Sequence, residues 1–118
     1  MKDLAPDIVR QRCLVEGFAS RKVVEADIRD YFKSVTGRLG LRAYGEPTIF
    51  SPGGIGKDGN QGFDAFIPLI DSGISLYYWA SRDFVSIVIY TCKSFDEAVA
   101  VEATKEFFGF KDAAWQSF

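Results

Sequence analysis

The sequence predicts an α+β fold, a two-layer sandwich in which two helices cover one face of a mainly antiparallel sheet. Three β-rich runs, at 63–70, 74–80 and 84–92, follow one another with only short turn-like segments between them, as antiparallel neighbours require. Segments with apolar residues at helical spacing lie before and after these runs. This order of elements is typical of a sheet with one covered face, whose other face meets water or a partner.

The length and composition favour one domain that spans residues 1–118. A chain of 118 residues is too short to enclose two full cores. Hydrophobic residues make up 47% of it and charged residues 25%, so enough apolar surface is available to offset the loss of backbone entropy. We expect the chain to fold unaided, and we find no internal repeat.

The first predicted elements are a strand and a helix. The short apolar run Arg12–Phe18 predicts the strand. Apolar residues then recur at three-and-four spacing from Val24 to Leu39, and Gly40 follows as a C-terminal stop, which predicts an amphipathic helix. In the region rich in glycine and proline at 45–62, only 48–50 has the composition of a strand.

A second helix is predicted to close the domain after the three strands. Ser94 and Glu97 have the spacing of a capping box, and Gly109 marks the end of the helix. Its mostly apolar face is predicted from Ala98, Val101, Lys105 and Phe108.

Residues 54–59 match the pattern G-x-G-x-x-G of dinucleotide-binding turns. Such a turn must lead from a strand into a helix, whereas this segment leads into a predicted strand. Asp58 also stands where a P-loop needs serine or threonine after its lysine. We therefore interpret the segment as a surface loop.

The composition excludes several classes of function. A formal net charge of −2 without long runs of one sign argues against nucleic acid as a partner. The absence of histidine argues against a zinc site and against a conventional catalytic triad, so no metal is predicted. Two isolated cysteines predict no disulfide, and the sequence shows neither a signal peptide nor a membrane span. We expect a cytoplasmic protein.

The last two predicted strands bring together two side chains that carry chemistry. A hairpin centred at Arg82 places Ser72 opposite Cys92, with their Cβ atoms about 5 Å apart. A hydroxyl and a thiol then share one pocket, or else two small residues simply fit the sheet. Tyr77 is five residues from Ser72, and this odd spacing predicts opposite faces of the strand.

Residues 71–92 resemble the central segment of the prokaryotic S-adenosylmethionine decarboxylases. Their pattern Glu-Ser-His-Ile-Ser-Ile-His-Thr-Trp is similar to Asp71-Ser72-Gly73-Ile74-Ser75-Leu76-Tyr77-Tyr78-Trp79, and their Thr-Cys-Gly is similar to Thr91-Cys92-Lys93 at the same spacing. Upstream, "TIFSPGG" resembles their Phe-x-Pro-x-Gly turn and Gly62-Phe63-Asp64 their Gly-Val-Ser. The segment "CLVEGFASRKVVEADIRDYF" resembles their first strand, turn and helix, so the likeness covers most of the chain.

The resemblance implies a fold, a reaction and a set of residues. Such a chain cleaves itself before the motif serine, here Ser72, which becomes a covalently bound pyruvoyl cofactor. That group serves the decarboxylation of S-adenosylmethionine in polyamine biosynthesis, and the motif cysteine, here Cys92, returns a proton to the product. The resemblance further implies a small-molecule ligand, S-adenosylmethionine or a related amine, and a homodimer.

Four of the departures from the family pattern concern the residues of the site. Glycine and tyrosine replace the two family histidines, at Gly73 and Tyr77, and aspartate replaces the processing serine and the glutamate before the cleavage site, at Asp64 and Asp71. A phenol with a pKa near 10 is a poor base at pH 7. A carboxylate at Asp64 could accept the serine proton, yet it would repel the developing oxyanion.

Three hypotheses follow from these residues. The first is a divergent decarboxylase-like protein with impaired or altered activity, in which Ser72, Cys92, Tyr77, Asp64 and Asp71 form the site. The second is an unprocessed, non-enzymatic ligand-binding or regulatory subunit. The third is a pyruvoyl enzyme that decarboxylates a different amine and uses Asp64 in place of histidine.

Overall fold

The computed structural model describes residues 1–53, 55 and 61–118 of the chain. Its elements in chain order are β1 (Gln11–Phe18), α1 (Glu25–Leu39), β2 (Thr48–Phe50), β3 (Phe63–Leu69), β4 (Ser72–Trp79), β5 (Phe84–Thr91), α2 (Glu97–Phe108) and β6 (Ala113–Ser117). Apart from Ile55, the segment with the G-x-G-x-x-G pattern lies outside the described residues.

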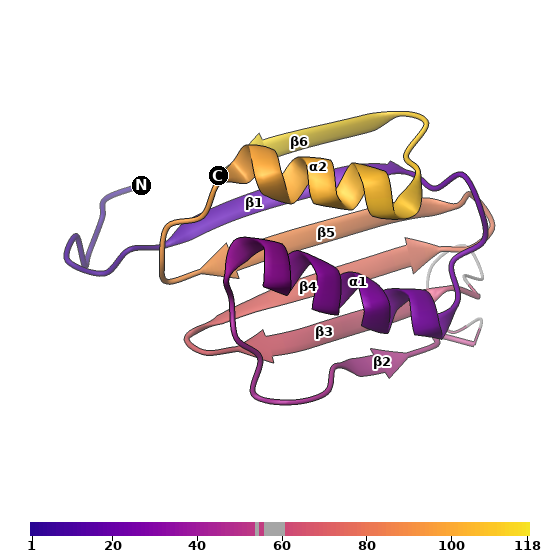
Figure 1. Cartoon of the computed structure of the whole chain (residues 1–118), viewed down its shortest axis with the longest axis horizontal. Helices are drawn as coiled ribbons and strands as arrows, with labels where there is room; N and C mark the ends of the chain where they lie inside the picture. Colours follow the sequence, from indigo (N-terminus) through magenta and orange to yellow (C-terminus); the bar gives the residue numbers. More distant parts are fainter. Residues whose placement is uncertain (54, 56–60) are drawn as a thin grey trace.

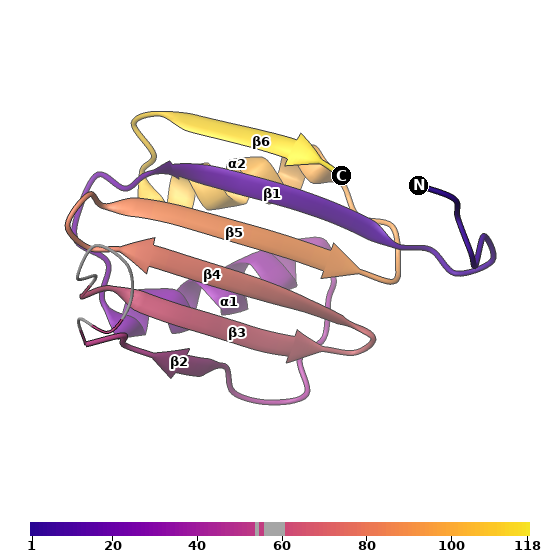
Figure 2. The same cartoon turned by 180° about the vertical axis from the view of Figure 1, so that it is seen from behind.

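The strands form a single antiparallel sheet in the order β2-β3-β4-β5-β1-β6, and both helices lie on one of its faces (Figure 1). The predicted α+β sandwich is thereby confirmed. The view from behind shows the other face without any helix over it (Figure 2). We call this side the open face.

The core lies between the sheet and the two helices. Alternate residues of the central strands are buried there, and they include Ile74, Leu76 and Tyr78 of β4. The helices α1 and α2 also contact each other, and the phenol of Tyr31 forms a 2.8 Å hydrogen bond with the Thr104 hydroxyl across this contact. Both of these residues are fully buried, so the one polar group satisfies the other.

Helix α1 ends as predicted, with Gly40 in the left-handed conformation at φ 66°. Helix α2 begins differently from the prediction. Its N-cap is Asp96, whose carboxylate accepts the backbone N–H of Ala98 at 2.9 Å, so the predicted capping box at Ser94 is wrong. Aspartate caps helices as well as serine does, and here it stands next to the first helical residue.

The face of α2 that meets the core is made largely of small residues. Val101 and Phe108 are buried as predicted, whereas Ala98 is exposed. The full set of buried residues is Ala100, Val101, Ala103, Thr104 and Phe108. Small side chains at these positions allow α2 to lie close to the sheet and to α1.

The hairpin of β4 and β5 is confirmed, but its register differs from the prediction by one residue. Tyr90 lies opposite Gly73, and the pairing continues to Trp79 opposite Phe84. The turn between them has four residues, 80–83, and its centre therefore lies before Arg82. Asp83 ends this turn in the left-handed conformation with φ 50°.

Strand β6 was not predicted, so the expectation that the second helix closes the domain is wrong. β6 pairs antiparallel with β1, from Cys13 opposite Ser117 to Gly17 opposite Ala113. Its sequence is poor in β-branched residues, and every side chain in it is exposed. Backbone pairing with β1 therefore holds it in place.

The open face carries a group of exposed or half-buried aromatic side chains. At one end of the strands, Phe84 contacts both Phe18 and Trp79, with ring centroids 5.4 and 5.6 Å apart. Phe66 and Tyr90, which are 44% and 37% exposed, lie toward the other end.

Within the described part of the chain, no helix is long and apolar enough to span a membrane.

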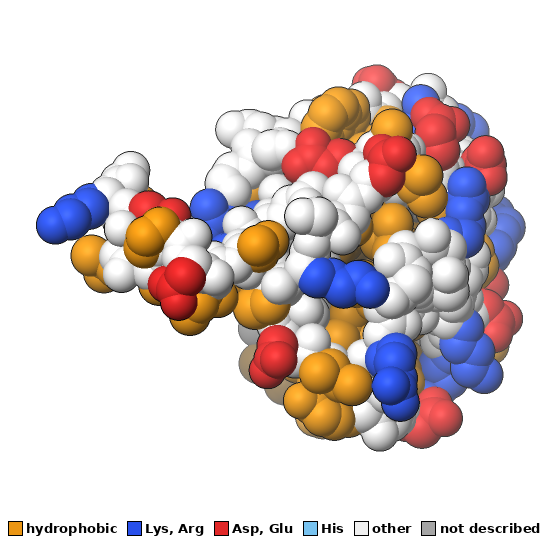
Figure 3. Space-filling view, turned by 60° about the vertical axis from the view of Figure 1, so that its left-hand side comes forward, with side chains coloured by type: hydrophobic (Ala, Val, Ile, Leu, Met, Phe, Trp, Pro, Cys, Tyr) orange, Lys and Arg blue, Asp and Glu red, His pale blue; other side chains and the backbone are white. Residues whose placement is uncertain are grey.

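The N-terminal residues 1–10 extend from β1 away from the body of the molecule (Figures 1 and 3). On the face that Figure 3 shows, acidic, basic and apolar side chains are mixed, and no large patch of one charge covers it.

Candidate functional site

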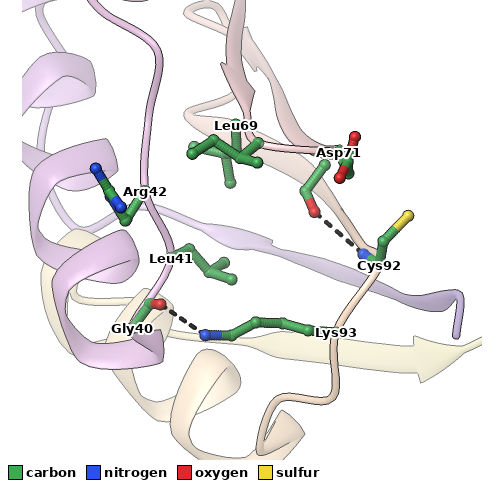
Figure 4. Close-up of a pocket in the computed structure, with 9 residues that line it drawn as sticks. Gly40, Leu41, Arg42, Leu69, Asp71, Cys92 and Lys93 are labelled. Atoms are coloured by element: carbon green, nitrogen blue, oxygen red, sulfur yellow. Dashed lines mark hydrogen bonds between the residues drawn. The ribbon is translucent and has the colours of Figure 1, made fainter.

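Ser72 and Cys92 are neighbours at one end of the central hairpin. Ser72 is the first residue of β4, and Cys92 directly follows the last residue of β5. The Cys92 backbone N–H donates a 3.1 Å hydrogen bond to the Ser72 hydroxyl oxygen (Figure 4). The backbone of Cys92, rather than its thiol, therefore makes the contact, and the sulfur points away from the hydroxyl (Figure 4).

Asp71 stands immediately before Ser72 in a two-residue turn. Leu69 lies opposite Ser72, so that only Ile70 and Asp71 connect β3 to β4. Asp71 has φ 53°, the left-handed region that aspartate adopts in tight turns more readily than most non-glycine residues do. This turn places the 71–72 peptide at the end of the hairpin beside Cys92.

A pocket of about 270 Å³ lies beside Ser72, toward the C-terminal end of α1 (Figure 4). Its walls come from three segments that are far apart in the sequence. They are Gly40, Leu41 and Arg42 after α1, Leu69, Ile70, Asp71 and Ser72 at the turn, and Cys92 and Lys93 after β5. We call this the Ser72–Cys92 pocket.

A second pocket, of about 330 Å³, lies on the open face and shares Asp71 and Ser72 with the first. Its remaining lining residues are Phe66, Gly73, Ser75, Val88 and Tyr90. The ring of Phe66 covers Gly73 so closely that a Cβ atom there would come within 2.7 Å of it. Phe66 therefore occupies the space that a side chain at position 73 would need.

Asp64 and Tyr77 do not lie in the Ser72–Cys92 pocket. They are directly opposite each other on β3 and β4, and both are on the open face. Because Tyr77 is five residues along β4 from Ser72, it lies roughly 16 Å away along the strand and on the opposite side, as its odd spacing predicted. The structure thus brings together Asp71, Ser72 and Cys92 but separates them from Asp64 and Tyr77.

Burial raises the pKa of several groups that lie outside the pocket. Cys13 is fully buried under α2, and its burial raises the pKa of the thiol to about 11. Tyr78 is buried at the far end of β4, where burial raises the pKa of its phenol to about 12. Both groups are protonated at neutral pH, so they serve as core residues.

Six pocket residues were not predicted as part of a site, and they are Gly40, Leu41, Arg42, Leu69, Ile70 and Lys93. Gly40 was recognised only as a helix stop, and more than fifty residues separate it from Lys93 along the chain. The Lys93 ammonium nevertheless donates a 2.9 Å hydrogen bond to the Gly40 carbonyl oxygen (Figure 4).

Among the described residues, no group of three or more Cys, Asp or Glu side chains is placed to hold a metal ion.

Comparison with known proteins shows the fold alone. No family model matches the chain, and no curated protein matches it. The solved structure of the adenosylmethionine decarboxylase from Aquifex aeolicus is similar to it, with a TM-score of 0.74 and 15% sequence identity. The match covers 94% of this chain and 89% of that one, so the chain shares the fold of that protein over nearly all of its length.

Proposed function

We propose that this chain is a divergent S-adenosylmethionine decarboxylase-like protein in which self-cleavage is impaired and the Ser72–Cys92 pocket binds a small ligand. The observation that carries this proposal is the separation of Ser72 and Cys92 from Asp64 and Tyr77. The serine and cysteine remain together, while the side chains that would replace the missing histidine base lie elsewhere.

Self-cleavage needs a base that takes the proton of the attacking hydroxyl and donors that stabilise the oxyanion. Among the described residues, the one hydrogen bond of the Ser72 hydroxyl is the one that its oxygen accepts from the Cys92 N–H. A backbone N–H cannot accept a proton. The surroundings of Ser72 therefore do not fit the formation of a pyruvoyl group, although Cys92 stands near the place where that group would form.

Two alternatives share this site. A non-enzymatic regulatory subunit needs only the fold and the pocket, and it agrees with the same placement of Asp64. A pyruvoyl enzyme for a different amine requires a base at Ser72, and Asp64 lies five residues along β3 from Leu69, the partner of Ser72. This distance makes the enzyme the less favoured of the two.

We also propose that two copies of the chain pair through their open faces. The exposed aromatic side chains Phe66, Tyr77 and Tyr90 are distributed over this face, and the pocket there borders Ser72. Exposed aromatic residues that surround a depression are typical of protein interfaces. Sedimentation of the purified chain tests this pairing, and a monomer at high concentration would contradict it.

Intact-protein mass spectrometry tests the central proposal. We expect a single species near 13.2 kDa, because among the described residues no side chain accepts a hydrogen bond from the Ser72 hydroxyl. Hydroxylamine or borohydride should add nothing to it, since no reactive carbonyl is present. Fragments 1–71 and 72–118 would contradict the proposal and support a processed enzyme, in which a Ser72→Ala variant should stay whole.

Thermal unfolding with added ligands tests the binding part. S-adenosylmethionine and related amines should raise the unfolding temperature of the uncut chain if they fit the pocket. A Leu41→Trp variant, which places a large side chain in the pocket wall, should abolish this shift. An equal shift in the variant would place the ligand elsewhere.

A further inference from the structure

Lys93 departs from the pattern that the chain otherwise resembles, which has glycine after the cysteine. Its side chain extends along the Ser72–Cys92 pocket from the end of β5 to the end of α1 (Figure 4). Glycine at this position would leave that side of the pocket without a charge. The lysine therefore gives this pocket a chemical character of its own.

Several contacts fix the position of Lys93. Its ammonium donates to the Gly40 carbonyl oxygen at 2.9 Å, and its own backbone carbonyl accepts the hydroxyl of Thr91. Cys92 lies between Thr91 and Lys93 in the sequence, and its backbone N–H donates to the Ser72 hydroxyl oxygen. The bonds of Thr91 and Cys92 thus fix the backbone from which the exposed Lys93 side chain extends, and the bond to Gly40 places its ammonium beside the pocket.

Two polar groups of the pocket, the Lys93 ammonium and the Ser72 hydroxyl, have hydrogen-bond donors to spare. An ammonium has three N–H groups, and the Gly40 carbonyl uses one of them. Within the described part of the chain, no carboxylate lies within salt-bridge distance of Lys93, and the Ser72 O–H has no acceptor. The single carboxylate in the lining, Asp71, lies on the opposite side of the pocket from the ammonium (Figure 4).

We propose that Lys93 binds the anionic group of the ligand, a carboxylate or a phosphate, with the Ser72 hydroxyl as a second donor. This inference rests on the proposed function, since it names the ligand class of the same pocket. A neutral carbonyl is a weaker acceptor for an ammonium than an anion is. The lysine is therefore held in place by Gly40 while its other two N–H groups stay free for the ligand.

An anion at Lys93 also bears on the reaction. An ion pair stabilises a carboxylate in the ground state, and it is lost when the carboxylate leaves as carbon dioxide. A lysine that binds a ligand carboxylate in this pocket would therefore slow decarboxylation. Lys93 and the missing base thus favour the same outcome, retention of the ligand rather than its conversion.

Titrations with sodium acetate and sodium phosphate, followed by amide NMR at constant ionic strength, test the proposal. We expect saturable shifts of the Ser72, Cys92 and Lys93 amides, with sodium chloride as the reference salt. Whichever anion binds more tightly identifies the ligand group as a carboxylate or a phosphate. The Lys93→Gln substitution should raise the Kd about tenfold, as the loss of one charge-assisted hydrogen bond predicts.

Lys33→Gln is the matched control, because it removes the same charge from an exposed lysine of α1 that does not line the pocket. This variant should change the Kd less than about twofold, since salt screens an exposed charge outside the pocket. Equal weakening by both substitutions, unchanged binding in Lys93→Gln, or no shift with either anion would overturn the proposal. Intact mass of the same sample reports separately on the proposed function, since cleavage before Ser72 would refute that proposal whatever the anions do.

Discussion

The Cys92 backbone N–H and the Ser72 hydroxyl oxygen are 3.1 Å apart, and this hydrogen bond closes the end of the central hairpin beyond its last paired residues. Regular pairing of β4 with β5 stops at Gly73 and Tyr90. The side chain of Ser72 therefore replaces a backbone acceptor for Cys92. This bond keeps the two residues adjacent without any direct contact between hydroxyl and thiol.

Removing the Ser72 hydroxyl should lower the stability of the chain. A Ser72→Ala variant loses the acceptor for Cys92, and we expect a loss of about 1 kcal/mol in the free energy of unfolding, because the site is partly open to water. Urea denaturation measures this loss. Ser75→Ala is the control on the same strand, since the Ser75 backbone pairs with β3 and β5 but its hydroxyl forms no hydrogen bond in the described part of the chain. Equal losses in both variants would show that the bond from Cys92 to Ser72 does not stabilise the chain.

The two thiols should differ strongly in reactivity. Cys92 is partly exposed, whereas Cys13 is buried and its pKa is raised to about 11. Since the thiolate is the reactive form, one thiol per chain should react with a disulfide reagent near neutral pH, and the second only on unfolding. A Cys92→Ser variant should lose the fast phase and Cys13→Ser should keep it. Two fast thiols in the native chain would show that α2 does not cover Cys13 as described.

The sequence was sufficient for the elements with a clear periodicity. The spacing of apolar residues from Val24 to Leu39 and the glycine at position 40 defined α1, because one helical face must be apolar and the left-handed stop favours glycine. The hairpin was found for a similar reason. Its register was not, because a turn of four residues and a turn of three differ by one position and the flanking strands are apolar enough to fit both.

Other features depend on contacts that leave no local pattern. Strand β6 has neither alternation nor β-branched residues, and it is defined by pairing with β1. The pocket wall that contains Gly40 and Lys93 forms only when the end of α1 comes to the end of β5. The positions of Asp64 and Tyr77 opposite each other likewise follow from sheet pairing, which the spacing within one strand cannot supply.

The contact between Tyr78, at the end of β4 away from Ser72, and Asp83 should stabilise the chain in a pH-dependent way. The buried phenol of Tyr78 donates to the Asp83 carboxylate at 2.7 Å and accepts the Val23 N–H at 3.2 Å. The bond from Tyr78, followed by the nearby Lys22 ammonium, lowers the pKa of Asp83 below its usual 3.8. A Tyr78→Phe variant should lose about 1–3 kcal/mol at pH 7, because the Val23 N–H is left unpaired in the core.

A lowered carboxyl pKa in the folded chain stabilises it above the unfolded pKa, and this stabilisation disappears as the pH falls through the folded value. The wild-type chain should therefore lose more stability below about pH 4 than Tyr78→Phe does, so the difference between the two should narrow. Urea denaturation midpoints of both chains at neutral and acidic pH measure this difference in stability. A difference that stays constant with pH would show that the phenol does not interact with the ionised Asp83.

Two glycines test whether β6 packs against β1 as described. A Cβ atom at Gly17 would meet the ring of Phe110 and lie 2.8 Å from the Asp112 carbonyl oxygen, whereas one at Gly37 in α1 would meet nothing within 4 Å. The Asp112 carbonyl also accepts the Phe18 N–H at 3.1 Å, so it cannot move without breaking the connection to β6. Gly17→Ala should therefore cost about 1–3 kcal/mol, and Gly37→Ala should gain about 0.5–1 kcal/mol through its lower backbone entropy. Calorimetric unfolding compares the two, and a Gly17→Ala variant as stable as the wild-type chain would mean that β6 and its preceding turn do not lie against β1.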